Sequence, residues 1–343
     1  MIEPPCLIEP IGLLHGAAAR EAIGLGLALP LQGGPSAFCL ARLIDDGGLA
    51  GAVIPVGQIP VGWHAALRRV VQAPPMAAIP QAPSVMGILN VTPDSFSDGG
   101  RHFHLPDAIA AGHAMIRAGA AILDIGGEST RPDAALIDPS VEQARILPLV
   151  AALRGQGALI SIDTRNGATM RAALDAGADL INDVSALAHD PTAAAMLASY
   201  DCPVVLMHMR GDPSTMTGLA QYEDVAVEVV RELELRIQHA TEAGIDRTRI
   251  IVDPGIGFAK NMAHNLEMLR RLPMLTNLGC RVLLGTSRKR FIGQVSDVGT
   301  AAGRDPGSIV SSLPGLAFPG GILRVHDVPA MMQAMRVWQA MQG

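Results

Sequence analysis

Acidic and amide side chains follow several short apolar runs of the sequence, at the point where each run ends. Asp124, Asp163 and Asp253 supply carboxylates, Asn182 an amide and Lys289 an ammonium group. Carboxylate and amide oxygens accept hydrogen bonds from a planar ligand with several N–H donors, such as a guanidine-like heterocycle. The ammonium can donate to a carbonyl or ring acceptor of the same ligand. These residues predict a site for a donor-rich heterocycle.

A second set of residues is cationic and lies on other segments. It consists of Arg131, Arg324 and His326. Arginine forks match phosphate oxygens, so a heterocycle on one side and phosphates on the other indicate a nucleotide-like or pterin diphosphate substrate. The residues alone do not choose between a pterin, a purine and a thiamine-type ring.

These side chains need a scaffold that brings distant segments together. From about Val85 onward, a short apolar run, a loop and an amphipathic helical stretch recur as a unit. The runs are Val85–Leu89, Ile122–Ile125, Leu159–Ile162, Leu180–Ile181, Val204–Met207, Ile250–Val252, Val282–Leu284 and Ile322–Val325. Eight strand–helix units predict an α/β fold, a (β/α)8 TIM barrel. The alternative, a doubly wound open sheet, usually has fewer strands and a glycine-rich dinucleotide loop, which is absent after the first run.

The loops after the strands form the active face of such a barrel. A single Asp or Asn after a strand is most often a helix cap or a turn residue. Polar residues at all eight strand ends would share one small rim, where like charges need a ligand or partner. The pattern therefore predicts a functional site. Helices are expected over Tyr222–Ala243 and Asn261–Leu272, and Pro314 should kink a helix over Ser308–Ala317.

Residues 1–83 do not follow this rhythm. Leu13–Leu27 could form an alanine-rich helix, and Ala37–Ile44 with Ala50–Val56 a hairpin. Prolines up to Pro83 read as a stiff linker. We expect residues 1–83 to be a small N-terminal α+β extension of unknown function, ahead of a barrel over 84–343 that folds without it.

Bulk composition narrows the class of protein. The net charge is −6 with no basic patch, which disfavours a nucleic-acid partner, and no apolar run is long enough to span a membrane. The first residues lack the basic region of a secretory signal, and four distant cysteines are typical of free thiols in a reducing cytoplasm. Of 26 basic residues only Lys260 and Lys289 are lysines, which favours a specific need for their compact ammonium groups.

Two long motifs and five short ones resemble one family in the same order. Gly87–Gly100 (GILNVTPDSFSDGG) resembles the first signature of dihydropteroate synthases, and Asp124–Pro132 (DIGGESTRP) resembles the second. The shorter matches are Ser161–Thr164, Ile181–Asp183, Asp253–Phe258, Ser287–Lys289 and Arg324–Asp327. The resemblance covers about Val85 to Gly343.

This resemblance implies roles for individual residues. Pterin recognition would fall to Asp124, Asp163, Asn182, Asp253 and Lys289, with Met207 lining the pocket. The p-aminobenzoate side would be lined by Thr130, Pro132, Phe258, Ser287 and Lys289. Mg2+ and the diphosphate would sit at Asn90, with further diphosphate contacts from Arg131, Arg324 and His326. The catalytic groups would be Lys289, Arg324, His326 and Asp163. Loops bearing Asp94, Phe96 and Arg131 would close over the site.

The implied reaction belongs to folate biosynthesis. It condenses 6-hydroxymethyl-7,8-dihydropterin diphosphate with p-aminobenzoate to give 7,8-dihydropteroate and diphosphate. The diphosphate leaves the pterin methylene carbon, which gains cationic character, and the aniline nitrogen attacks it. Cations and a metal stabilise the charge that develops on the leaving group.

The chain departs from the family pattern at a few positions. Asp133 and Ala259 stand where the family commonly has glycine, and Pro314 and Pro319 fall in the seventh helix region, which helps to form the family's homodimer. Two alternatives therefore remain. One is a pterin-binding relative without catalysis, and the other is a barrel that transfers a methyl group from a reduced folate, which would not need Ser287–Lys289.

Overall fold

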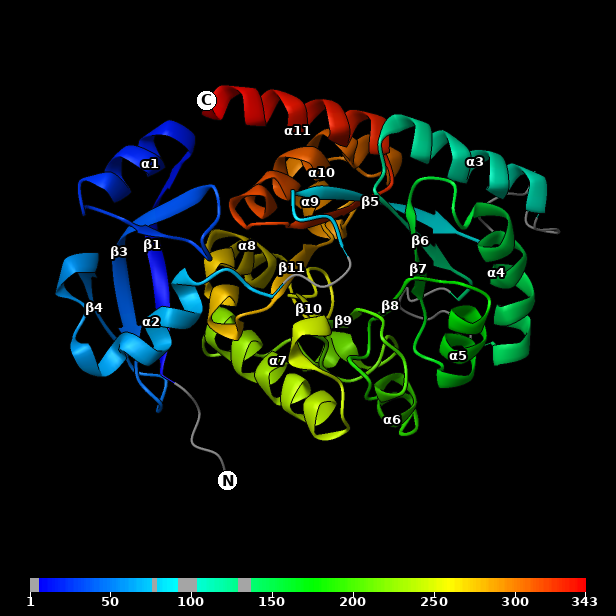
Figure 1. Cartoon of the computed structure of the whole chain (residues 1–343), viewed down its shortest axis with the longest axis horizontal. Helices are drawn as coiled ribbons and strands as arrows, with labels where there is room; N and C mark the ends of the chain where they lie inside the picture. Colours follow the sequence, from blue (N-terminus) through cyan, green and yellow to red (C-terminus); the bar gives the residue numbers. More distant parts are fainter. Residues whose placement is uncertain (1–5, 76–78, 92–103, 129–136) are drawn as a thin grey trace.

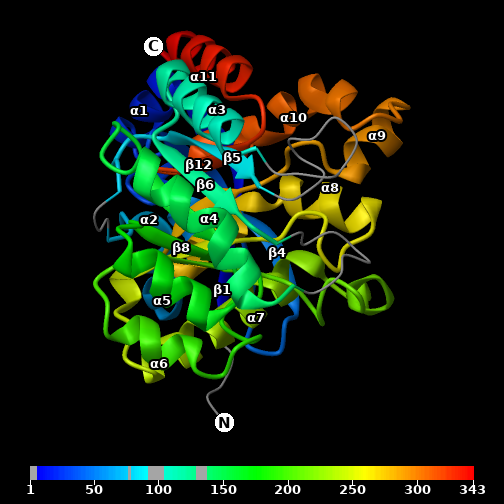
Figure 2. The same cartoon turned by 90° about the vertical axis from the view of Figure 1, so that its right-hand side faces the viewer.

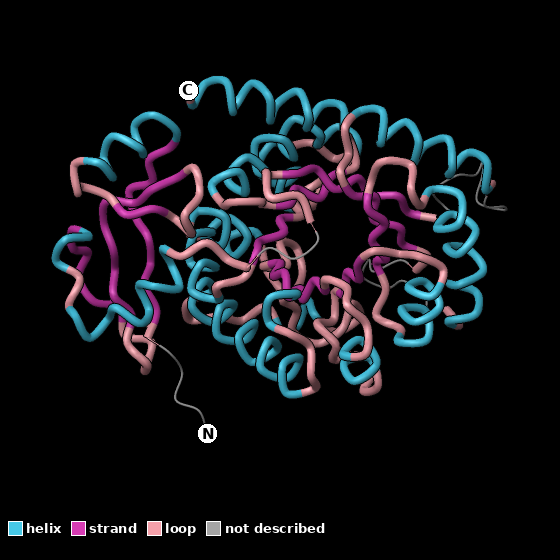
Figure 3. Tube along the Cα trace, viewed as in Figure 1, coloured by secondary structure: helices cyan, strands magenta, loops and turns pink. Residues whose placement is uncertain are grey.

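A closed barrel of eight parallel strands forms the larger part of the molecule. The structure, a computed structural model, describes residues 6–75, 79–91, 104–128 and 137–343. Each barrel strand pairs with two neighbours, and Figure 3 shows the ring of strands inside the helices. The strands are β5 (Ser84–Asn90), β6 (Ile122–Gly126), β7 (Leu159–Asp163), β8 (Leu180–Asp183), β9 (Val204–Met207), β10 (Ile250–Asp253), β11 (Arg281–Leu284) and β12 (Ile322–Val325). The predicted (β/α)8 barrel is confirmed.

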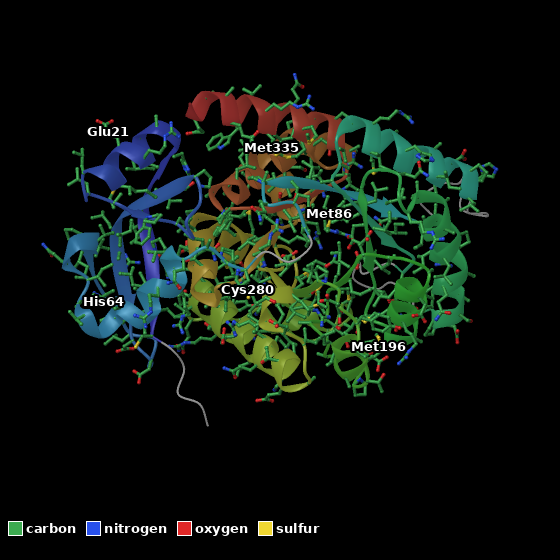
Figure 4. All side chains as sticks on the ribbon, viewed as in Figure 1. Glu21, His64, Met86, Met196, Cys280 and Met335 are labelled. Carbon is green, nitrogen blue, oxygen red and sulfur yellow. The ribbon has the colours of Figure 1, made fainter. Side chains whose placement is uncertain are left out.

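Alternation of side chains along the strands explains why polar groups gather at one end of the barrel. A separate buried cluster contains Ile79, Met86, Ile122, Leu180, Val205, Ile251, Leu283 and Ile322; Met86 is labelled in Figure 4. Successive side chains of a strand point to opposite faces, so the residue two positions later points the same way. Two positions after members of this cluster stand Asp124, Asn182, Asp253 and Arg324. These polar side chains therefore enter the barrel one layer closer to the carboxyl ends of the strands.

Helices cover the outside of the barrel, and α3, α4 and α5 lie on the side away from the N-terminal residues (Figures 1 and 2). The helices are α3 (Leu105–Ala118), α4 (Pro139–Leu153), α5 (Gly167–Asp175), α6 (Ala193–Ala198), α7 (Val225–Glu242), α8 (Met262–Arg270), α9 (Arg290–Ser296), α10 (Asp305–Ser312) and α11 (Val328–Gln342). The two predicted helical stretches correspond to α7 and α8. The expected helix over Ser308–Ala317 is divided into two, because α10 ends at Ser312 and a 3-10 helix, η7 (Leu313–Ala317), follows it with Pro314 in its first turn. No helix in the described ranges is long and apolar enough to cross a membrane.

The N-terminal extension is a small sheet with two helices. Its elements are β1 (Leu7–His15), α1 (Gly16–Gly24), β2 (Leu29–Pro30), β3 (Ser36–Ile44), β4 (Ala50–Pro55) and α2 (His64–Val71). The predicted hairpin is confirmed, since β3 and β4 pair antiparallel. The predicted helix over Leu13–Leu27 is wrong at its start, because Leu13 and Leu14 pair with β3 as part of β1. Strand β1 and helix α2 were not predicted.

The extension packs against the flank of the barrel, where β1 and α2 contact the 3-10 helix η5 (Leu272–Leu278) and Arg231 of α7 donates to the carbonyl of Asp45 (Figure 1). Ile8 N–H donates to Asn277 Oδ1 (2.9 Å), and Asn277 Nδ2 donates to Ile8 O (2.8 Å). Gln32 Nε2 donates to the carbonyl of Cys280 (3.2 Å). Cys280 is labelled in Figure 4. Buried apolar residues of the extension and the barrel form one continuous cluster. This packing gives no support to a barrel that folds alone, and the division of the chain at residue 83 stays a prediction.

Candidate active site

Asp124, on the inner side of β6, is fully buried and accepts three hydrogen bonds. Its Oδ1 accepts from Ser161 Oγ (2.5 Å), and its Oδ2 accepts from Asn182 Nδ2 (3.0 Å) and Arg324 Nε (2.6 Å). A buried carboxylate needs such donors to offset the loss of its hydration. The structure thus brings together three of the predicted site residues and fixes Asp124 in place.

Asp163 ends β7 and differs from Asp124 in one respect. Arg324 Nη2 donates to its Oδ2 (2.6 Å), whereas Oδ1 is buried and has no hydrogen-bond partner among the described residues. Burial raises the pKa of Asp163 to about 7, although the charge of Arg324 acts in the opposite direction. A buried acceptor without a donor is destabilising by about 1–3 kcal/mol. Such an atom indicates a place for a donor supplied by a ligand.

Arg324 joins the two predicted sets of site residues. The sequence placed it with the phosphate-binding cations, and in the structure its guanidinium pairs with Asp124 and Asp163. Burial acts to lower the pKa of Arg324, but the two carboxylates outweigh it and raise that pKa above its ordinary value. Arg324 is therefore a permanent cation held between the carboxylates of Asp124 and Asp163.

Asp253 and Lys289 lie around the turn that follows β10. Asp253 Oδ1 accepts from Gly255 N–H (2.7 Å), and no described residue donates to its Oδ2. Lys289 Nζ donates to the carbonyl of Ile256 (2.5 Å) and lies 4.2 Å from the centroid of the Phe258 ring. Burial lowers the pKa of Lys289 to about 8, opposed by Asp253, and burial raises the pKa of Asp253. The ammonium, the carboxylate and the aromatic ring form one wall of the site.

The loops after β11 and β12 are tied together by predicted site residues. Ser287 Oγ lies 2.9 Å from His326 Nδ1, and His326 N–H donates to Ser287 Oγ (3.1 Å). Met207 ends β9 and is buried beside Gly255. Asn90 ends β5, where it pairs in register with Gly126, which in turn pairs with Asp163. Asn90 is thus two strands from Asp163 on the same rim.

Five predicted site residues lie outside the described residues, and nothing tests their roles: Asp94, Phe96, Thr130, Arg131 and Pro132. The described chain before the last three ends at Glu128. Arg165 donates to both carboxylate oxygens of Glu128 (3.1 and 3.2 Å), and both side chains are buried. This ion pair fixes the chain end from which residues 129–136 continue.

The described residues contain no cluster of three His, Cys, Asp or Glu side chains suited to a metal ion. A protein cage is not required for Mg2+, which is commonly held by one or two protein oxygens together with substrate phosphates and water. The amide oxygen of Asn90 suits such a role. Asp124 and Asp163 are already paired with Arg324, so Asn90 is the better candidate ligand.

Sequence reasoning missed several residues that shape the site. Ser161 was noted only as part of a motif, yet it holds Asp124. Lys260 was singled out for its rarity but given no role, and it lies buried with its Nζ 2.8 Å from His208 Nδ1. The scarcity of lysine in this sequence was the signal that could have pointed to a role for Lys260. Its hydrogen-bond partners are His208, which follows β9, and the carbonyls of Gly255 and Phe258, and no spacing in the sequence connects Lys260 with His208.

Together these features define an α/β-barrel enzyme with a cluster of acidic residues, held by an arginine, at the carboxyl ends of its strands. A sequence profile of the family described as pterin binding enzyme matches residues 86–326. The chain belongs to this pterin binding enzyme family.

Individual relatives narrow the comparison. The chain is 43% identical over 258 residues to a dihydropteroate synthase of Synechocystis sp., covering 75% of this chain and 89% of the relative. Two solved structures of Xanthomonas albilineans dihydropteroate synthase are also similar, each over 76% of this chain and 94% of theirs. The one with 4-aminobenzoic acid has 46% identity and a TM-score of 0.71, and the one with 7,8-dihydropteroate has 43% and 0.69.

Proposed function

We propose that this chain is a dihydropteroate synthase, a transferase that condenses 6-hydroxymethyl-7,8-dihydropterin diphosphate with p-aminobenzoate to give 7,8-dihydropteroate and diphosphate. The observation that carries this proposal is the buried layer of Asp124, Asp163 and Arg324, in which Asp163 Oδ1 has no donor among the described residues. A ligand rich in N–H groups supplies what this layer lacks.

For the pterin, we propose polar contacts from Asp124, Asp163, Asn182, Asp253 and Lys289, with Met207 as an apolar wall. Asp163 Oδ1 and Asp253 Oδ2 are the atoms best placed to accept ring N–H groups, because no described residue donates to them. A pocket with unpaired acceptors selects against rings that cannot donate, since those rings would leave the acceptors buried and unsatisfied.

For p-aminobenzoate, we propose a slot formed by Phe258, Ser287 and Lys289, completed by Thr130 and Pro132. The stem of Lys289 offers an apolar surface, while its ammonium over the Phe258 ring gives the slot a positive charge. An aromatic carboxylate suits both properties.

For the diphosphate, we propose Arg131, Arg324 and His326 as protein contacts and Asn90 as the protein ligand of Mg2+. When bound, Mg2+ would neutralise part of the negative charge that develops on the leaving diphosphate. The loops bearing Asp94, Phe96 and Arg131 would close over both substrates.

The reaction then needs positioning and charge stabilisation more than proton transfer. The bond between the pterin methylene carbon and the diphosphate oxygen breaks, and its electron pair leaves with the diphosphate. The carboxylates of Asp124 and Asp163 lie where they would stabilise the positive charge left on the methylene-pterin. The amine of p-aminobenzoate forms the new carbon–nitrogen bond and loses a proton. In this scheme Lys289, Arg324, His326 and Asp163 are the catalytic groups.

Two further assignments belong to the same proposal. All four cysteines are free thiols, which supports a cytoplasmic location. We also propose a homodimer that uses the α10 region, supported by Val310, whose exposed fraction of 69% leaves an apolar side chain on that helix uncovered. Sedimentation of the wild type and of Val310→Asp at equal concentrations tests the dimer.

The activity is tested with purified full-length chain, Mg2+ and both substrates. We expect diphosphate release that depends on p-aminobenzoate, and we expect Asp253→Ala to lose binding of the pterin diphosphate by calorimetry. Absence of release, or release that is independent of p-aminobenzoate, would contradict the proposal.

A further inference from the structure

The loop after β10 has an unusual backbone that needs outside support. Gly255, Gly257 and Ala259 all adopt the left-handed region, with φ of 65°, 84° and 47°. For alanine this conformation costs about 1–2 kcal/mol, and such positions persist only where the surroundings hold them. The same loop supplies the Ile256 carbonyl that binds Lys289 and the Phe258 ring beneath its ammonium.

Lys260 supplies that support from behind the loop. Its side chain is only 8% exposed, and its Nζ donates to the carbonyls of Gly255 (3.2 Å) and Phe258 (3.2 Å) and to His208 Nδ1 (2.8 Å). An ammonium has three N–H donors, and here three acceptors meet them. A planar guanidinium could not reach the same three atoms, which accounts for a lysine in a chain that otherwise uses arginine.

The third acceptor is itself fixed. His208 Nε2 lies 2.9 Å from Glu232 Oε2, so the ring accepts at Nδ1 and donates at Nε2. His208 N–H also donates to the carbonyl of Asp253 (2.9 Å). Glu232, on α7, is held in turn by Arg210. The ammonium is thus anchored through His208 and Glu232 to a rigid helix.

The arrangement is costly for stability, which argues that it serves another purpose. Burial lowers the pKa of Lys260 to about 7, with Asp253 and Glu232 acting in the opposite direction. A well-packed apolar side chain in place of a buried ion is often neutral or stabilising. The chain nevertheless places one of its two lysines here and the other, Lys289, on the opposite side of the same loop.

We propose that Lys260 is a positioning residue for the p-aminobenzoate half of the reaction. It holds loop 254–259 in the shape that places Phe258 and Lys289, and it does so without touching either substrate. This proposal rests on the proposed synthase activity. It predicts a larger defect for p-aminobenzoate than for the pterin, because Asp124, Asp163 and Asn182 on the pterin side are held by other contacts, whereas Asp253 and Lys289 also bind this loop.

The test uses Lys260→Met in the full chain, which keeps the stem and removes the three donors. We expect KM for p-aminobenzoate to rise at least ~10-fold, equivalent to about 1.4 kcal/mol, and the Kd for the pterin diphosphate to rise by a clearly smaller factor. The melting temperature should fall no further than in Arg249→Met, because both variants leave buried carbonyls without their donors. If KM for p-aminobenzoate is unchanged, or if pterin affinity falls as much as p-aminobenzoate affinity, Lys260 has no positioning role.

Two further variants make the result interpretable. Lys260→Gln retains an N–H donor and should raise KM for p-aminobenzoate less than Lys260→Met does. If Lys260→Met is insoluble, Lys260→Gln takes its place in the test, and the same outcomes support or contradict the proposal. Arg249→Met is the matched control, because Arg249 is a buried cation bound to the carbonyls of Cys202 and Leu197, outside the proposed site. It should lower the melting temperature and leave both substrate constants unchanged. If the wild type has no synthase activity, the proposed function is wrong. If the wild type is active and Lys260→Met has an unchanged KM for p-aminobenzoate, only the positioning role of Lys260 is wrong.

Discussion

Two networks in this molecule each join an arginine to two carboxylates that are buried or partly buried. They differ in whether every carboxylate oxygen has a hydrogen-bond donor among the described residues. Inside the barrel, Arg324 bridges Asp124 and Asp163. On the flank, Arg271 bridges Glu9 of the extension and Asp224, the N-cap of α7.

In the flank network, each of the three nitrogens of the Arg271 guanidinium donates to a carboxylate. Arg271 Nε and Nη2 donate to Glu9 (2.7 and 3.1 Å), and Nη1 donates to both oxygens of Asp224 (2.8 and 2.9 Å). Glu9 also accepts from Arg42 (2.9 Å). In the barrel, Asp163 Oδ1 has no such partner among the described residues. The complete network holds two parts of the chain together, and we propose that the incomplete one accepts a ligand.

The largest expected effect is on the flank. Arg271→Met leaves Glu9, which is 5% exposed, without its main partner, and breaking a buried pair costs about 3 kcal/mol or more. Chemical denaturation should show this loss, while Kd for the pterin diphosphate should stay at the wild-type value. The control is Arg270→Met, because its pair with Glu267 is exposed and contributes little. An equal loss in both variants would mean that the flank network is not special.

A smaller effect, of the opposite kind, is expected inside the barrel. In Asp163→Asn the side chain has one acceptor oxygen and one N–H donor group. Either Arg324 or the ligand would then face an N–H group with its own N–H donor, and that hydrogen bond would be lost. We expect pterin affinity to fall ~10- to 100-fold, equivalent to about 1–3 kcal/mol, without loss of stability at pH 8. Calorimetry and thermal melting measure the two quantities, and wild-type affinity would refute the role of Oδ1.

The pH dependence of stability sharpens the same comparison. Because the pKa of Asp163 is raised from 3.8 to about 7 by burial, the folded state binds this proton more tightly than the unfolded state does. Stability from this group is present below about pH 4 and is lost as pH rises to about 7. Asp163→Asn should therefore gain stability relative to wild type as pH rises from about 4 to about 7. A constant difference across that range would argue against the raised pKa.

The smallest effect is expected at Ala259. Glycine at this position would remove the backbone strain of an alanine in the left-handed region. It would also remove a buried methyl group and increase the conformational entropy of the unfolded chain, so the stabilising and destabilising contributions nearly cancel. We expect Ala259→Gly to change the free energy of unfolding by no more than about 0.5 kcal/mol. Gly255→Ala is the contrast, because an added Cβ would lie 1.9 Å from the carbonyl oxygen of His208. Equal stability of these two variants would contradict the loop geometry.

Features that depend on residues close together in the sequence could be predicted, whereas contacts between residues far apart in the sequence could not. The barrel strands are short apolar runs, and their polar ends share one rim by symmetry, so both were visible along the chain. Strand β1 was hidden because Glu9 and Pro10 interrupt its apolar pattern and because its burial depends on η5. The contacts of Arg271 with Glu9 span 262 positions, and those of Lys260 with His208 span 52. No local pattern encodes such pairs, because the folded barrel creates them.

The comparison of the two networks is tested most directly by one calorimetric titration of the pterin diphosphate, carried out on Asp163→Asn and Arg271→Met alongside the wild type. The incomplete network should bind substrate and the complete one should not. We therefore expect at least ~10-fold weaker binding by Asp163→Asn, equivalent to about 1.4 kcal/mol, and wild-type affinity for folded Arg271→Met. Unchanged affinity in Asp163→Asn, or an equal loss in both variants, would contradict the assignment of the barrel network to substrate.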